Sequence, residues 1–163
     1  MDSGQLQQAV SGLDFQVSGR FEWKRLDEGW LIDDSYNANP GSFRGVLQSI
    51  RFMHPKTPLI AVIGPMAELG ENAKQLHKEV GEVIYHSGCK KLLVLGGDLG
   101  ESYLEGWKNT GGPKEDAKRY ESLEELKNDF QQDWDQRSIV LVKGSRSAAM
   151  ERFVKAILNH ESE

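Results

Sequence analysis

Three short polar clusters in this 163-residue chain contain side chains that could bind a charged small molecule. The first, Asp33–Pro40, holds two carboxylates, two amides, a hydroxyl and a phenol within eight residues. Amides and carboxylates hydrogen-bond ribose hydroxyls or base edges, and an aromatic ring stacks on a purine. The same residue types favour helix caps and turns, so a capping loop in front of a helix is the competing interpretation.

The second cluster is Gly64–Gly70, which is followed by His77. Its glycines suit a tight turn, and Glu68 could accept a charged hydrogen bond. His77 falls on a predicted helix, where a histidine is more often a packing or capping group than a catalyst. Since no second His or Cys lies at ligand spacing, we expect no metal site.

The third cluster, Lys143–Ser147, places two cations beside the backbone N–H groups of a predicted helix start. Lys143 and Arg146 in that position suit a carboxylate or a phosphate. A solvated loop with a serine cap is the alternative interpretation.

The elements that must position these clusters alternate between strand and helix. Short apolar runs predict strands buried on both faces, and apolar residues at helical spacing predict the helices between them. The predicted strands are 30–34, 58–64, 92–95, 117–120 and 138–142, and the helices centre on 43–50, 76–84, 99–107, 122–130 and 150–158. Residues 21–34 indicate an antiparallel hairpin turning at 26–29. The alternation predicts an α/β fold whose mostly parallel sheet binds ligands beyond the carboxyl ends of its strands.

Composition narrows the class of protein. Hydrophobic residues make up 38% and charged residues 28%, as in a single globular domain. The net charge of −5 argues against nucleic-acid binding, which depends on neutralising phosphates. No apolar run is long enough for membrane insertion, and no secretory leader opens the chain. The single Cys89 is expected to be a buried structural thiol, which fits a cytoplasmic location.

Several common catalytic motifs are missing from the sequence. It has no Gly-x-x-x-x-Gly-Lys-[Ser/Thr] phosphate loop and no Gly-x-Gly-x-x-Gly run opening a helix. The lone cysteine has no evident histidine partner, which argues against thiol catalysis. We therefore expect no catalytic residue and no metal ligand within this chain alone.

Taken in order, the clusters resemble the C-terminal domain of Mur ligases of the MurF type. The resemblance covers about residues 20 to 158 and rests on Gly19–Glu22, Asp33–Pro40, Gly64–Gly70 with His77, and Lys143–Arg146 with Met150 and Glu151. The Tyr36–Pro40 run is the most specific part. One departure is Pro65, which stands where the family usually has Asp; it removes a carboxylate and a backbone N–H. We assign Pro65 no role in a site.

The resemblance implies a Rossmann-like sheet of about six strands, flanked by helices, with the hairpin at one edge. It further implies a three-domain ATP-dependent acid–D-amino-acid ligase that adds D-Ala-D-Ala to UDP-MurNAc-tripeptide in peptidoglycan synthesis. A central domain would hold the phosphate loop and most of the ATP and Mg²⁺. Residues 1–17 would be a tail of that central domain, and residues 18–163 would be the C-terminal domain, inactive alone.

The resemblance also implies roles for individual residues. Arg20 would lie near the ATP phosphates, Asp34 near the ribose, and Tyr36, Asn37 and Asn39 around the base and ribose. The D-Ala-D-Ala acceptor would contact Lys143, Ser145 and Arg146. The alternatives are the C-terminal domain of a related Mur ligase or folylpolyglutamate synthase, and a stand-alone α/β binding module. The sequence does not set the oligomeric state.

Overall fold

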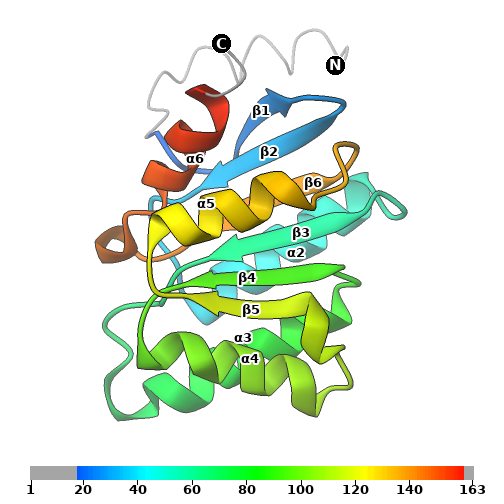
Figure 1. Ribbon diagram of the computed structural model, residues 1–163. Coiled ribbons are helices and arrows are strands. Elements are labelled where there is room, and N and C mark those ends of the chain that lie inside the picture. Colours follow the sequence, from blue (N-terminus) through cyan, green and yellow to red (C-terminus); the bar gives the residue numbers. More distant parts are fainter. Residues whose placement is uncertain (1–17, 160–163) are drawn as a thin grey trace, which may run out of the picture.

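The computed structural model describes residues 18–159, so the prediction for residues 1–17 lies outside the described chain. The domain is a six-stranded, mostly parallel sheet flanked by helices, which confirms the predicted fold (Figure 1). The strands are β1 (Glu22–Leu26), β2 (Gly29–Asp34), β3 (Leu59–Ile63), β4 (Lys91–Leu95), β5 (Ala117–Tyr120) and β6 (Ile139–Lys143). The α-helices are α2 (Pro40–Met53), α3 (Ala73–His86), α4 (Asp98–Asn109), α5 (Leu123–Gln132) and α6 (Glu151–Leu158). Three short 3₁₀ helices are η1 (Gly70–Asn72), η2 (Lys114–Asp116) and η3 (Arg146–Ala148).

The strands lie in the order β1-β2-β6-β3-β4-β5. β1 and β2 form the antiparallel hairpin at one edge, and every other neighbouring pair is parallel. The last strand in the chain, β6, lies between β2 and β3, pairing Asp34 with Lys143 and Ile63 with the same lysine. The clusters that follow these three strands therefore emerge side by side.

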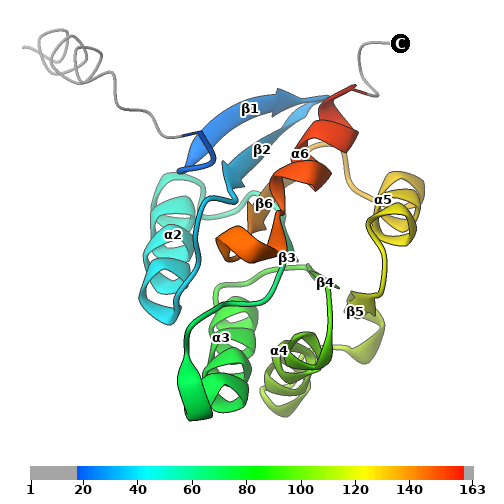
Figure 2. The same cartoon turned by 90° about the vertical axis from the view of Figure 1, so that its left-hand side faces the viewer.

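Helices cover both faces of the sheet. α2, α3 and α4 lie on one face and α5 and α6 on the other, as the view onto the carboxyl ends of the strands shows (Figure 2). Alternate residues of each inner strand belong to opposite cores: Ala61 and Ile63 face the first group of helices, Ile60 and Val62 the second. Because both faces are buried, all five residues of β3 are apolar, as are the first four of β6.

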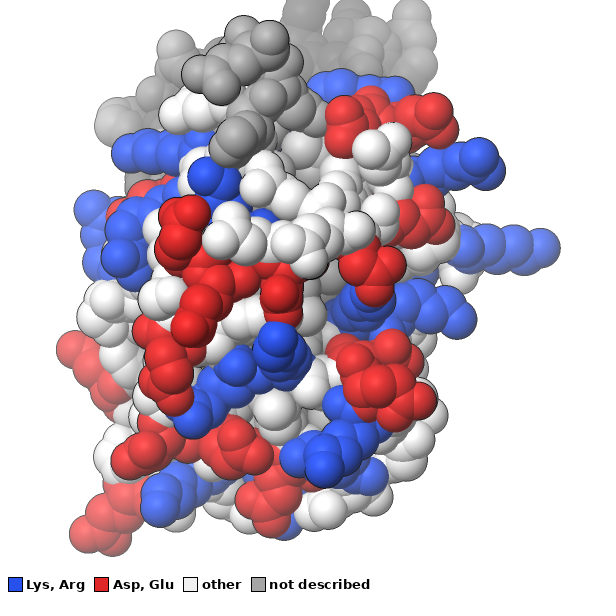
Figure 3. All heavy atoms as spheres, viewed as in Figure 1, with Lys and Arg blue, Asp and Glu red and all other residues white. Residues whose placement is uncertain are grey.

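Charged side chains of both signs are interspersed over the face that carries α5 and β5 (Figure 3). No helix among residues 18–159 combines the length and the apolar composition needed to cross a bilayer. Cys89 is buried, its thiol donates to the carbonyl oxygen of Leu59 at 3.2 Å, and burial raises the pKa of this thiol to about 12. The predicted burial of this thiol is confirmed.

Helices α3 and α4 pack against each other through two glycines. A β-carbon added at Gly106 would lie 1.9 Å from the carbonyl oxygen of Lys78, and one at Gly81 would lie 2.1 Å from that of Tyr103. Contacts this short exclude any side chain, so the two helix backbones approach as closely as they do because both positions are glycine. Gly45, in the middle of α2, has nothing within 4 Å of its added β-carbon.

These glycines give a matched test of the packing. Gly106→Ala should lower the free energy of unfolding by about 2–3 kcal/mol, because α4 must move away from α3. Gly45→Ala should raise it by about 0.5–1 kcal/mol, because alanine has the better helix propensity and meets no neighbour. Urea denaturation of both variants measures this; equal effects of the two substitutions would contradict the close helix approach.

Candidate functional site

A cleft of about 310 Å³ opens at the carboxyl ends of β2 and β6. Its lining residues come from the segment before β1, the β2–α2 loop, the first turn of α2 and the end of β6; they are Arg20, Phe21, Asp34, Tyr36, Asn37, Asn39, Ser42 and Lys143. The structure therefore brings together every residue predicted to contact ATP, together with one of the three predicted to contact the acceptor. Phe21 and Ser42 were not predicted, since neither type carries a ligand-binding signal by itself.

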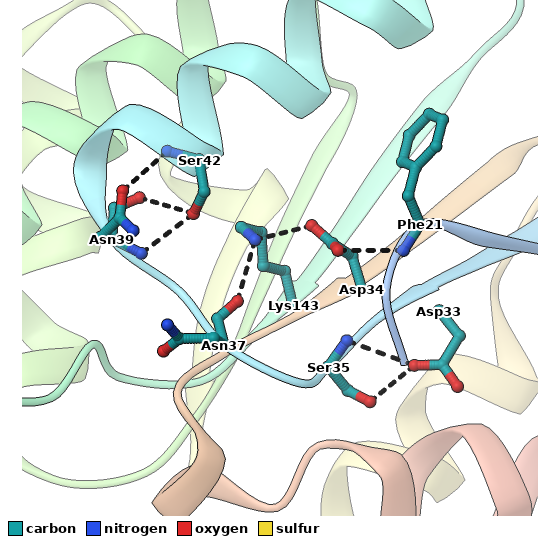
Figure 4. A network of polar contacts seen from close by, with 8 residues as sticks. All are labelled: Phe21, Asp33, Asp34, Ser35, Asn37, Asn39, Ser42 and Lys143. Carbon is teal, nitrogen blue, oxygen red and sulfur yellow. Dashed lines mark hydrogen bonds and ion pairs between the residues drawn. The ribbon is translucent and has the colours of Figure 1, made fainter. Parts of the chain in front are cut away.

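Lys143 and Asp34 form a largely buried ion pair in the lining of this cleft, in which the lysine is buried and the aspartate partly exposed (Figure 4). The Lys143 ammonium donates to Asp34 Oδ2 at 2.6 Å and to the backbone carbonyl oxygen of Asn37 at 3.0 Å. The other carboxylate oxygen of Asp34 accepts the backbone N–H of Phe21 at 3.0 Å. Lys143 is 1% exposed, and its ammonium lies 5.3 Å from the ring centroid of Phe43.

The β2–α2 loop is shaped by its own polar side chains. Asp33 Oδ1 accepts both the backbone N–H of Ser35 at 3.2 Å and its hydroxyl at 2.6 Å, which turns the chain after β2. Asn39 then caps α2: its Oδ1 accepts the backbone N–H of Ser42, and the Ser42 hydroxyl accepts that of Asn39. Pro40 occupies the first turn of the helix. The capping interpretation of this cluster is thus correct for Asn39, which also lines the cleft.

Tyr36 stands between this cleft and a second one. The guanidinium carbon of Arg20 lies 4.3 Å from the Tyr36 ring centroid, and that of Arg146 lies 5.0 Å from it. Tyr36 also lines the second cleft, of about 390 Å³, to which Arg146 contributes. Among residues 18–159, neither arginine has an ion-pair partner, so both charges are available to a ligand.

The three predicted acceptor residues are separated in the structure. Lys143 is buried in the first cleft and Arg146 is exposed in the second. Ser145 lines neither: it is 2% exposed, its hydroxyl lies 3.0 Å from that of Ser147, and its N–H donates to the carbonyl oxygen of Pro65. The second cleft also contains Lys24 and Lys155, which the sequence did not single out, and Glu151, which belongs to the resemblance but was assigned no role.

The first cleft fits a nucleoside better than a metal ion. It offers a phenol ring, two amides and an exposed guanidinium, which suit a base, a ribose and a phosphate. Its single carboxylate, Asp34, is already paired with Lys143. Among the described residues, no group of three or more His, Cys, Asp or Glu side chains could hold a metal ion. A magnesium ion that accompanies a nucleotide would need ligands from outside this cleft.

Comparison with known families decides what kind of domain this is. The family described as "Mur ligase, glutamate ligase domain" matches residues 19–146, which include every predicted site residue. The chain belongs to this family. The match confirms the resemblance of the clusters at the carboxyl ends of β2, β3 and β6.

Individual relatives of this Mur ligase domain support the same family assignment. The chain is 36% identical over 142 residues to UDP-N-acetylmuramoyl-tripeptide--D-alanyl-D-alanine ligase of Escherichia coli, covering 86% of this chain and 30% of that protein. A crystal structure of MurF from Acinetobacter baumannii superposes with a TM-score of 0.76 at 26% identity, over 94% of this chain and 34% of the other. MurF ligase of Thermotoga maritima in complex with ADP shares the fold, with a TM-score of 0.74 at 23% identity over 90% and 32% of the two chains. The chain thus spans about a third of the length of these relatives.

The Mur ligase domain holds its β3–α3 loop with two buried rings. His77 Nε2 accepts the N–H of Met66 at 2.9 Å, while Nδ1 lies 2.6 Å from the carbonyl oxygen of Ala73. Because the amide must donate and the carbonyl must accept, the neutral ring carries its proton on Nδ1. Tyr103 packs edge-on against His77 and donates its hydroxyl to the carbonyl oxygen of Gly64 at 3.0 Å. The prediction that His77 is a packing or capping group is confirmed.

Burial lowers the pKa of His77 below its ordinary value of 6.5, so the folded domain holds this proton less tightly than the unfolded chain does. Unfolding therefore takes up a proton at acidic pH, and the free energy of unfolding should fall as the pH drops below 6.5, by up to about 1.4 kcal/mol per pH unit. His77→Gln should lack this component. Urea denaturation between about pH 7.5 and 5 measures it, with the exposed His86→Gln as the matched control. The same pH dependence in the His77 variant and the wild type would contradict the assignment.

Proposed function

We propose that this Mur ligase domain is the C-terminal domain of the cytoplasmic ATP-dependent ligase that joins D-Ala-D-Ala to UDP-MurNAc-tripeptide in peptidoglycan synthesis. The observation that carries the proposal is the cleft itself: Arg20, Asp34, Tyr36, Asn37 and Asn39 line one hollow although they come from separate segments. Residues 1–17 would then be the tail of the preceding central domain, and residues 18–163 the C-terminal domain.

The first cleft would take the nucleoside end of ATP. The amides of Asn37 and Asn39 are exposed and can bond the base and ribose, and Arg20 can reach a phosphate. A purine would contact the Tyr36 ring beside the guanidinium groups of Arg20 and Arg146, which already lie against it. Asp34 has one oxygen on Lys143 and the other on Phe21, so a ribose hydroxyl would use the remaining lone pairs.

The acceptor would lie nearby, on the Arg146 side of Tyr36. The exposed guanidinium of Arg146 is suited to the carboxylate of D-Ala-D-Ala, and bidentate pairing would fix the dipeptide's orientation. In the full-length ligase, ATP would supply the phosphoryl group that activates the tripeptide carboxylate, releasing ADP, and Mg²⁺ held by the central domain would neutralise the phosphate charge. The part played by this domain is to hold nucleotide and amine in a reactive geometry when the two domains close.

The chain alone should have no ligase activity. It contains no phosphate loop, so no part of it can position the transferred phosphoryl group. A phosphate-release assay with ATP, UDP-MurNAc-tripeptide and D-Ala-D-Ala should give no signal above the protein-free blank, whereas the full-length Escherichia coli relative serves as the positive control. Turnover by the chain alone would refute the division of labour between domains.

Nucleotide binding tests the cleft directly. Titration of the isotopically labelled chain with ADP, followed by amide chemical shifts, should perturb Tyr36, Asn37 and Asn39. Asn37→Ala should weaken the binding by about tenfold, as expected from the loss of one or two hydrogen bonds. Gln48→Ala, in the apolar groove between α2 and α3, is the matched control and should change nothing.

Two outcomes would count against the proposed function. One is an ADP response centred on the groove around Gln48 and Val83. The other is the absence of any response at the β2–α2 loop up to ADP concentrations of about 10 mM. A dissociation constant above that concentration corresponds to a binding free energy of less than about 3 kcal/mol.

A further inference from the structure

We infer that Lys143 is a positioning residue, which assembles the nucleotide cleft from three chain segments and does not itself contact the acceptor. This inference rests on the proposed function and changes the role assigned to one residue within it. Two observations support it: the ammonium group is buried, and its hydrogen-bond partners belong to the segments that form the cleft.

The Lys143 ammonium is already enclosed by protein. The whole residue is 1% exposed, and its side chain is 2% exposed. The ammonium donates to Asp34 Oδ2 at 2.6 Å and to the Asn37 carbonyl oxygen at 3.0 Å, and it lies over the Phe43 ring. Two of its three N–H donors are already used, and because the side chain is only 2% exposed, an acceptor carboxylate could reach the third only if the cleft wall moved.

Each partner of Lys143 belongs to a different part of the cleft. Asn37 lies in the β2–α2 loop, so its carbonyl contact holds the stretch that carries the two exposed amides. Asp34 connects Lys143 to a third segment, the residues before β1, because its other oxygen accepts the N–H of Phe21. On the other side of Arg20, the carbonyl oxygen of Gly19 accepts the N–H of Tyr36 at 2.9 Å.

Arg20 is therefore fixed on both sides by the network that Lys143 anchors. Gly19 is tied to Tyr36, and Phe21 is tied to Asp34. Phe21 adopts a positive φ of 51°, a conformation that residues other than glycine rarely take and that these contacts must hold in place. Loss of the ammonium would release Asp34 and with it the backbone on which Arg20 is presented to a phosphate.

A buried ion pair of this kind is a weak source of stability, because desolvation offsets most of the attraction. Replacing both partners together by neutral groups of similar size is often tolerated, whereas removing one partner leaves a buried charge. Lys143→Met combined with Asp34→Asn is therefore the informative variant, since it removes both charges while keeping an oxygen that can face Phe21.

The test compares local order with global stability in the full chain. In the Lys143→Met/Asp34→Asn variant, both amides keep their acceptors, but the Lys143 contacts that hold these segments together are removed. Amide hydrogen exchange at Phe21 and Tyr36 should therefore accelerate by about tenfold, which corresponds to the net free energy of one hydrogen bond, while the core amides of β3 keep their protection. The ADP dissociation constant should rise by about the same factor. Lys143→Gln/Asp34→Asn is also neutral at both positions, but its two amides can still hydrogen-bond to each other; it should give a smaller acceleration at Phe21 and covers the case in which the Lys143→Met variant does not fold.

The matched control is Lys91→Met/Asp133→Asn, which removes an exposed ion pair of 2.9 Å outside both clefts. It should leave exchange at Phe21 and Tyr36 unchanged. Unchanged exchange at these two amides in the Asp34 and Lys143 variants would overturn the inference. Failure of the wild-type chain to bind ADP would instead count against the proposed function, because the exchange measurement needs no ligand.

Discussion

The parallel pairing of β6 between β2 and β3 is the constraint on which the site depends. Because β6, the last strand in the chain, pairs with β2, Asp34 and Lys143 lie opposite each other in the sheet although they are 109 positions apart in the sequence. The backbone ladder alone would bring the two chain ends close. The ion pair between Asp34 and Lys143 then fixes the direction in which each polar loop leaves the sheet. Without β6 in the centre, the loops after β2 and β6 would belong to unrelated parts of the surface.

Much of the fold follows from signals that are local in sequence. The apolar runs in β3, β4 and β6 are short and unbroken, as is typical of strands in a sheet covered on both faces. The segments between them carry apolar residues at helical spacing. The hairpin was equally readable, with its turn at Asp27 and Glu28. The N-cap at Ser122 follows from residue type alone, since its hydroxyl accepts the N–H of Glu125 as a capping residue should. Each of these features depends on residues within a few positions of one another.

The sequence predicted which polar residues lie together at one edge of the sheet, but not how they are arranged there. Residue types identified the loops, whereas the accessibility of a lysine depends on what the folded chain places above it. Lys143 follows four apolar residues of a central strand, and that position buries it, although its charge suggested a surface group. The opposite holds for Arg146, which lies only three residues later, beyond the turn, and is exposed. Tertiary packing also separates the three predicted acceptor residues, which lie in two clefts and a buried loop.

The attachment of Gly19 to the cleft has a mechanical consequence. Because Gly19 is hydrogen-bonded to Tyr36, the first described residues lie at the rim of the first cleft. If the domain rotated about Gly19, the rim of the first cleft would move least. Strand β5, at the opposite edge of the sheet, would move furthest. A large rotation of the domain about this point would thus change the position of the first cleft relative to Gly19 only slightly.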